Sequence, residues 1–96
     1  MHTASIITEF IGTFVFLSVI LATGSAIPIA VALAAVIFFG GNVSGGHFNP
    51  AVSTMMWIKG AISAEKWAAY VIAQVLGGLV ALWWFLYTQS SLKHKK

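Results

Sequence analysis

The chain has 96 residues, of which 59% are hydrophobic and only 7% are charged, and its mean hydropathy is +0.94. This composition excludes a soluble globular domain and is typical of an integral, multi-pass membrane protein. The net charge of +3 comes from five lysines and two glutamates, and the absence of cysteine excludes a disulfide or a thiolate metal site.

Three apolar stretches predict membrane-spanning helices over residues 5–23, 27–43 and 65–87. Each is close to the roughly 20 residues that cross a hydrocarbon core. We read the first as a span and not as a cleaved signal peptide, because no Lys or Arg precedes it and another apolar segment follows at once. The connection between the first two stretches is short, which favours two antiparallel helices that lie side by side. The second is rich in Ala and Gly, which let helix backbones approach closely.

Residues 44–58 interrupt this pattern and predict a re-entrant segment. Gly, Ser, Asn and His fill residues 42–48, which indicates irregular backbone. Asn49 is a favoured helix N-cap and Pro50 suits the first helical position, so a helix should begin there and end near Ile58. Such a helix is about 15 Å long, half of the hydrocarbon core, and therefore enters the membrane without crossing it.

The last stretch should begin at a cap formed by Ser63, with Glu65 in its first turn. Aromatic residues near the two ends of the bundle predict interfacial belts, although plain packing would suit them equally: Trp57, Trp67, Trp83, Trp84 and Tyr87. The basic tail, residues 92–96, should rest on anionic lipid headgroups or serve as a solubilising end or topology signal. We expect no nucleic-acid partner.

Irregular backbone at membrane depth must be buried in protein or line a water-filled cavity, because unpaired carbonyls in lipid are costly. A half-helix that begins at Asn49 also points its positive dipole end at the midplane, which opposes cations, while the Asn49 amide can donate to a neutral solute. The two glutamates lie in different helices with no nucleophile and base near them, so we expect no enzymatic activity and no cofactor. His2 and His94 lie at the termini, so we expect no metal site.

Three blocks in this order resemble the first half of the aquaporin, or major intrinsic protein, family: EFIGTF at 9–14, SGGHFNPAVS at 44–53 and YVIAQVLGG at 70–78. The resemblance covers the whole chain except the lysine tail. It implies an all-α membrane protein with three transmembrane helices plus one re-entrant half-helix, which together form an aquaporin-like half-bundle. It also implies a passive channel for water and small neutral solutes such as glycerol.

The resemblance further implies roles for single residues. Solute would pass Asn49, Ala51 and the backbone carbonyls of a four-residue ladder: Gly45, Gly46, His47 and Phe48. Support of the loop would come from Glu9, Gln74 and Pro50. Two alternatives stay open: Glu9 could contact solute directly, as intramembrane carboxylates often do, and His47 could anchor the loop or face the pore.

Family members carry two such halves in inverted orientation, and this chain supplies one. We therefore expect a second, inverted copy to complete the pore as an antiparallel homodimer, and four clustered pores would need eight chains. Dual topology requires a weak charge bias. Two lysines fall on the side of the N-terminus and three on the other side.

The selectivity filter should also differ from that of the family. Family members usually place an arginine after their second motif, together with an aromatic residue from the second helix. This chain has Val52 after Ala51, Ile29 at the start of its second span, and no arginine. Gly46, Val52 and Ile29 would therefore line a wider, more apolar constriction.

Two other hypotheses stay open. The chain could be a non-conducting membrane subunit that associates with full-length aquaporin relatives, although the loop, the cap and the half-helix are all present. It could also be a piece of a longer gene product, although the lysine-rich end resembles a terminus.

Overall fold

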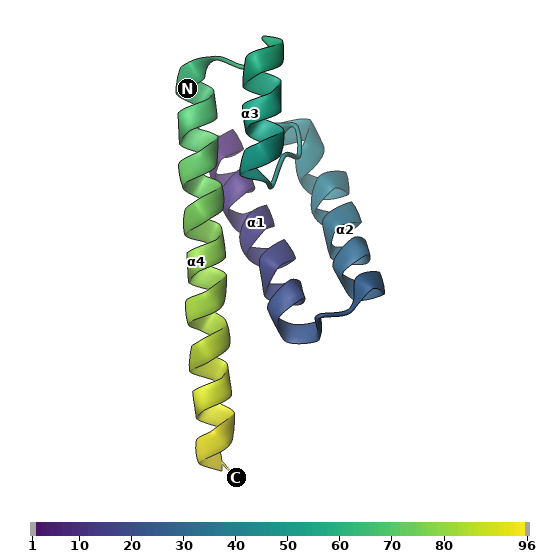
Figure 1. Ribbon diagram of the computed structural model, residues 1–96, viewed down its shortest axis with the longest axis vertical. Helices are drawn as coiled ribbons and strands as arrows, with labels where there is room; N and C mark the ends of the chain where they lie inside the picture. The colour runs from purple at the N-terminus through teal and green to yellow at the C-terminus, as the bar shows by residue number, and fades with distance from the viewer. Residues whose placement is uncertain (1, 96) are drawn as a thin grey trace.

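A computed structural model describes residues 2–95, with side chains through Leu92, and contains four helices (Figure 1). They are α1 (Thr3–Thr23), α2 (Ala26–Ser44), α3 (Pro50–Lys59) and α4 (Ala64–Lys95). No strand occurs among residues 2–95. Helix α1, helix α2 and the Ala64–Leu92 part of α4 are long and apolar enough to cross a membrane. The predicted all-α half-bundle with three spans is confirmed.

Helix α4 is longer than predicted at both ends, because it begins at Ala64 and continues to Lys95. Residues 88–95 contain neither glycine nor proline, and their Gln, Leu and Lys residues are good helix formers. Nothing therefore ends the helix after Tyr87. The prediction that the helix stops at residue 87, before a separate tail, is wrong, because residues 92–95 of that tail are helical. The predicted lipid contact of this tail falls on Lys96 and on side chains of residues 93–95, which lie outside the described residues.

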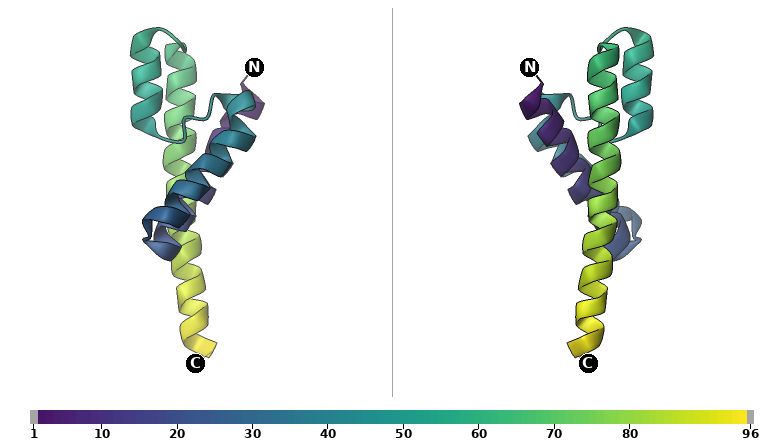
Figure 2. Two further views of the ribbon diagram at one scale, coloured as in Figure 1. Left: turned by 90° about the vertical axis from the view of Figure 1, so that its right-hand side faces the viewer. Right: turned by 90° about the vertical axis from the view of Figure 1, so that its left-hand side faces the viewer.

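Helix α1 packs against both α2 and α4, and the short α3 packs against α4. The N-terminus and the connection between α3 and α4 lie at one end of the molecule, and α4 ends at the other (Figure 1). Helices α1 and α4 diverge toward the N-terminal end (Figure 2). They lie close together at Gly77, where a Cβ atom would be only 2.7 Å from the carbonyl oxygen of Phe10. A glycine there allows the two backbones to touch, as small residues do in membrane helix pairs.

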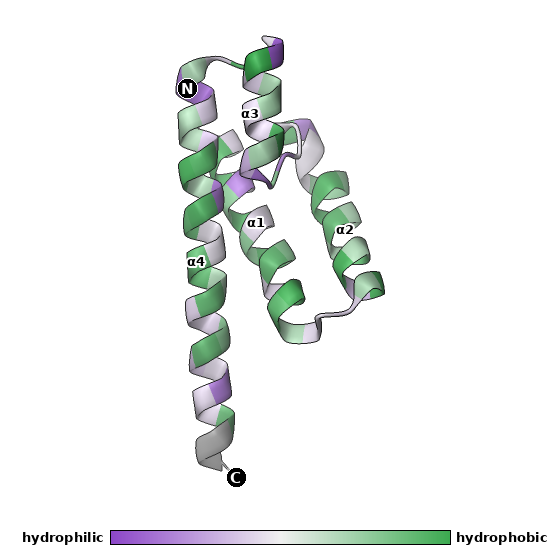
Figure 3. Cartoon of the chain, in the orientation of Figure 1, coloured by the Kyte–Doolittle hydropathy of each residue, from purple (hydrophilic) through white to green (hydrophobic). Residues whose placement is uncertain are grey.

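The interior is more polar than the surface. The largest fully buried side chains are those of Tyr70, Gln74, Glu9, Thr13 and Ser53. Large apolar side chains such as Phe38, Phe39 and Ile72 are instead exposed. Hydrophilic colour accordingly appears in the middle of the bundle, where the loop before α3 meets α1, while most of the helix surface is hydrophobic (Figure 3). This distribution suits a protein whose outer solvent is lipid.

Helix α2 contacts the rest of the chain along a narrow strip. Only Ala32, Gly40 and Ser44 of this helix are buried. Three of the small residues that predicted close packing are exposed, namely Ala30, Ala34 and Ala35. One face of α2 is therefore open in the single chain.

Candidate functional site

The segment between α2 and α3 turns sharply back through three left-handed residues. Gly45 and Gly46 have φ angles of 93° and 69°, and Phe48 has a φ of 52°. Glycine adopts this region freely, whereas a residue with a side chain pays about 1–2 kcal/mol. The conformation of Phe48 therefore needs compensation from its surroundings.

Glu9 of α1 contributes to that compensation, since its fully buried carboxylate accepts four hydrogen bonds, one of them from the Phe48 backbone. Oε2 accepts from the Ser44 hydroxyl at 2.7 Å and from the His47 backbone N–H at 3.0 Å. Oε1 accepts from the Phe48 backbone N–H at 2.7 Å and from the Gln74 amide at 2.8 Å. All four partners are donors, so both oxygens of the side chain act as acceptors. One side chain thus ties α1, the end of α2, the loop and α4 together.

A second row of contacts joins the half-helix to α4. The Gln74 amide also donates to the Ser53 hydroxyl at 2.9 Å, and that hydroxyl lies 2.8 Å from Nδ1 of His47. The Tyr70 hydroxyl donates to the Ser44 carbonyl at 2.6 Å, and its ring packs edge-on against His47 at 5.1 Å. We call Glu9, Ser44, His47, Ser53 and Gln74 the polar hub. It is buried throughout.

The Phe48 side chain is held by glycines on two helices. The ring is 2% exposed and lies against Gly12 of α1 and Gly40 of α2. A Cβ atom on Gly12 would overlap the ring, and one on Gly40 would lie 3.1 Å from it. These two glycines therefore form the socket in which the left-handed Phe48 is seated.

Helix α3 begins as predicted. Asn49 is its N-cap, with its side-chain oxygen accepting from the Ala51 N–H at 2.8 Å, and Pro50 occupies the first helical position. The cap is confirmed. It leaves the other half of the Asn49 amide, Nδ2, without an acceptor in the described part of the chain, on an exposed residue.

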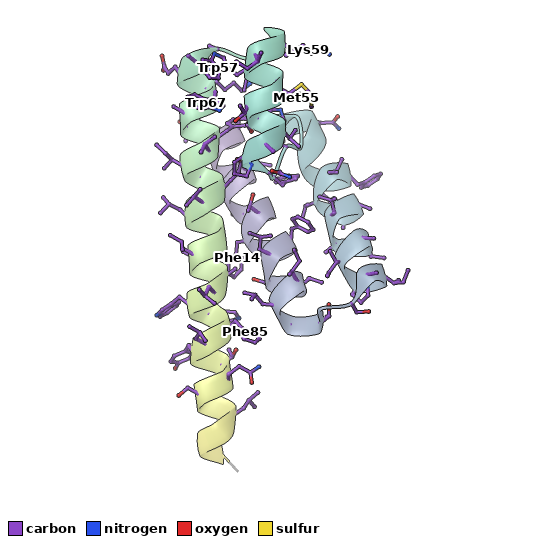
Figure 4. All side chains as sticks on the ribbon, in the orientation of Figure 1. Phe14, Met55, Trp57, Lys59, Trp67 and Phe85 are labelled. Atoms are coloured by element: carbon purple, nitrogen blue, oxygen red, sulfur yellow. The ribbon has the colours of Figure 1, made fainter. Side chains whose placement is uncertain are left out.

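The far end of α3 is held by aromatic rings. Trp57 of α3 stacks on Trp67 of α4, with ring centroids 4.3 Å apart (Figure 4). The indole N–H of Trp67 donates to the Thr54 hydroxyl at 2.9 Å. We call these three residues the aromatic clasp. Unlike the polar hub, it is partly exposed.

A groove of about 490 Å³ opens beside the start of the half-helix. Polar groups reach it from α1, α3 and α4 among apolar side chains, and its lining residues are Thr13, Phe16, Leu17, Phe48, Asn49, Pro50, Gln74, Val75, Gly78 and Leu79. The carbonyls of residues 45–48 accept no hydrogen bond from the described residues. The loop thus keeps four acceptors and one amide donor free at the middle of the bundle.

Other predicted pore residues are spread along the bundle. Ala51 is exposed and Val52 half-buried in the first turn of α3, and Gly46 is half-buried in the loop. Ile29 lies near the start of α2, about 22 Å along the helix from the loop, and so is far from Val52 and Gly46 within one chain. The His47 ring is buried against Ser53 and Tyr70 and therefore does not face the groove.

Ser44, Ser53 and Tyr70 were not given roles in the sequence interpretation, although each bonds to the loop or its braces. The sequence did contain a signal for these three residues, because hydroxyl side chains inside apolar membrane segments must find hydrogen-bond partners in the protein. Among the residues that the structure describes, no group of three or more His, Asp or Glu side chains could hold a metal ion.

The fold and the site define a multi-pass integral membrane protein with a re-entrant, Asn-capped half-helix. A family model of the major intrinsic protein family matches residues 2–96. The chain therefore belongs to the major intrinsic protein family.

Two curated proteins are similar to this chain over most of its length. A glycerol uptake facilitator protein-like 6 from Lactiplantibacillus plantarum is 43% identical over 86 aligned positions, which cover 78% of this chain and 39% of the relative. Aquaporin Z from Photorhabdus laumondii is 34% identical over 88 positions, which cover 76% of this chain and 38% of the relative. The chain thus spans about two fifths of the length of these relatives. No solved structure matches significantly.

Proposed function

We propose that the chain forms a passive channel for water and small neutral solutes such as glycerol. The observation that carries this proposal is the free set of acceptors and donor at the start of α3: four loop carbonyls and the Asn49 amide, held in place by the polar hub. A neutral solute can exchange hydrogen bonds with these groups. The positive end of the α3 dipole opposes cations at the same point. The names of the two relatives agree with this class of solute.

One half-bundle does not enclose a pore. Helix α3 has ten residues and reaches about half-way across the membrane, and the groove at its start is open on one side. We propose that a second, inverted copy closes the groove and lays its half-helix end to end with the first. The open surface of α2 supports this, because its exposed Ala30, Ala34 and Ala35 lie among larger apolar side chains such as Phe38, and small residues allow another helix to pack closely.

The inverted arrangement also accounts for the separated filter residues. Gly46 and Val52 lie at the start of α3, and Ile29 lies at the opposite end of α2. An inverted partner brings its own Ile29 toward the end of the membrane at which the first copy has its α3. The constriction would then be lined by aliphatic residues and glycine. We expect it to be wider and less polar than one that contains an arginine.

Stopped-flow swelling of proteoliposomes tests the channel itself. We expect water and glycerol to enter faster than in empty vesicles, and Val52→Arg to reduce glycerol entry more than water entry because it adds a bulky charge at the constriction. Parent permeability equal to that of empty vesicles would refute the channel and leave the non-conducting subunit as the better description.

Single-cysteine cross-linking tests the inverted dimer on a chain that has no cysteine of its own. A disulfide needs Cα atoms within about 7 Å. Ala51→Cys should therefore cross-link two copies where the half-helices meet. Lys59→Cys, at the outer end of α3, should not. The opposite pattern, with cross-linking only at position 59, would indicate a parallel ring.

A further inference from the structure

A furrow between α1 and α4 at the N-terminal end of the molecule is separate from the groove at Asn49. The two helices diverge toward this end (Figure 2). The inner part of the furrow has a volume of about 430 Å³ and is lined only by apolar side chains, with Ile6 and Phe10 on one wall and Ala69 and Ala73 on the other. The outer part, of about 290 Å³, shares Ile6 and Ala69 with it and adds polar residues.

The polar residues of the outer part lie in line with the apolar residues of the inner part. Ile6 and Phe10 of α1 lie four residues apart and share a helix face, and His2, the N-cap residue of α1, precedes Ile6 by the same interval. On α4, Glu65 and Ala69 show the same spacing. The furrow runs about 16 Å along α4, from residue 65 to residue 76, and changes from charged to apolar in the direction of the membrane interior.

The polar and charged groups at the outer end of the furrow suit a zwitterionic headgroup. Glu65 is exposed and forms no ion pair within the described residues, because the neighbouring Lys66 lies over the Tyr70 ring at 5.4 Å. The Glu65 carboxylate can accept hydrogen bonds from an ammonium group. Across the furrow, the His2 imidazole and the Thr3 hydroxyl can donate to a phosphate.

We propose that this furrow binds a phospholipid with a primary amine, of the phosphatidylethanolamine type. The ammonium pairs with Glu65, the phosphate lies by His2 and Thr3, and one acyl chain lies between the two helices down to the level of Ala73. A choline headgroup has no N–H to donate to Glu65. A phosphatidylglycerol headgroup carries the phosphate charge but no ammonium group to pair with Glu65.

Native mass spectrometry of the protein, released from nanodiscs of equimolar dioleoyl phosphatidylethanolamine, phosphatidylcholine and phosphatidylglycerol, tests the site. We expect retained ethanolamine lipid to exceed choline lipid about threefold, the size of an exposed ion pair. Glu65→Gln should remove this preference without removing bound lipid. Lys59→Gln, at the same end but off the furrow, should leave the preference intact.

The proposed position of the acyl chain is tested by filling the furrow with a larger side chain. Ala69→Phe should lower the retention of all three lipids, whereas Ala68→Phe, which lies one residue away and lines no part of the furrow, should not; circular dichroism checks that both variants are folded. Equal retention of the three lipids by the parent, or an unchanged preference in Glu65→Gln, would overturn the proposal. So would a cross-linked dimer of Ala69→Cys, since a second copy would then occupy the furrow.

Discussion

The two ends of the half-helix α3 are held by opposite kinds of contact. Its start is fixed by the polar hub, in which buried donors converge on the Glu9 carboxylate. Its far end is fixed by the aromatic clasp, in which two half-exposed indoles stack. A buried polar group costs several kcal/mol when its partners are lost, whereas a stacked aromatic pair contributes about 0.5–1.5 kcal/mol. The start of α3 should therefore be rigid, and its outer end should open first.

The largest effect should come from Glu9→Gln, which keeps the shape of the side chain. One oxygen becomes an NH₂ group that faces a backbone N–H, that of His47 or of Phe48, so at least one buried hydrogen bond becomes a repulsive contact. We expect a loss of about 3–5 kcal/mol of unfolding free energy, the size of breaking a buried charged pair. Unfolding in detergent measures it, together with loss of permeability in vesicles.

Glu65→Gln is the matched control, because this glutamate is exposed at the start of α4. Its effect on stability in detergent should stay within about 0.5 kcal/mol. Equal losses for the two variants would mean that the polar hub does not hold the loop.

Gly12→Ala tests the socket for Phe48. The added methyl group would overlap the aromatic ring, which cannot move without disturbing the left-handed backbone beneath it. We expect a loss of about 2 kcal/mol, typical of overpacking, in thermal unfolding. At Gly41, by contrast, the nearest atom to an added Cβ is 4.0 Å away, so Gly41→Ala should leave the protein as stable or slightly more stable.

Tyr70→Phe removes a single hydrogen bond, from the Tyr70 hydroxyl to the Ser44 carbonyl, and keeps the contact of the ring with His47. The expected loss is about 1 kcal/mol, the usual net value for one bond. Chemical unfolding detects this difference. The exposed Tyr87 offers the control, and Tyr87→Phe should leave stability unchanged.

Trp67→Phe should have the smallest effect on stability, about 0.5 kcal/mol, since a smaller ring remains and the lost bond to Thr54 is exposed to solvent. Hydrogen exchange should instead show faster exchange in the last turn of α3, with the loop amides of residues 47 and 48 unchanged. A larger loss of unfolding free energy for Trp67→Phe than for Tyr70→Phe would mean that the outer end of α3, and not its start, is the more firmly held.

Local rules predicted the capped start of α3, because Asn49 and Pro50 act through their immediate neighbours. They also placed three spans near the observed ones. The end of α4 was missed, since polar residues after Tyr87 suggest a stop but contain no helix breaker. The partners of Ser44 and Ser53 could not be derived from the pattern, because their contacts depend on how α1, α3 and α4 cross. Glu9 and Gln74 came to attention through resemblance to the family, and their hydrogen bonds required the structure.

The four partners of Glu9 are reached at very different times during synthesis. Ser44, His47 and Phe48 lie 35, 38 and 39 residues further along the chain, and Gln74 lies 65 residues further. A carboxylate without partners is costly within lipid, so α1 cannot settle into its final surroundings as soon as it is made. Its stable insertion has to wait for α2, the loop and then α4, which makes the assembly of this small bundle cooperative across nearly its whole length.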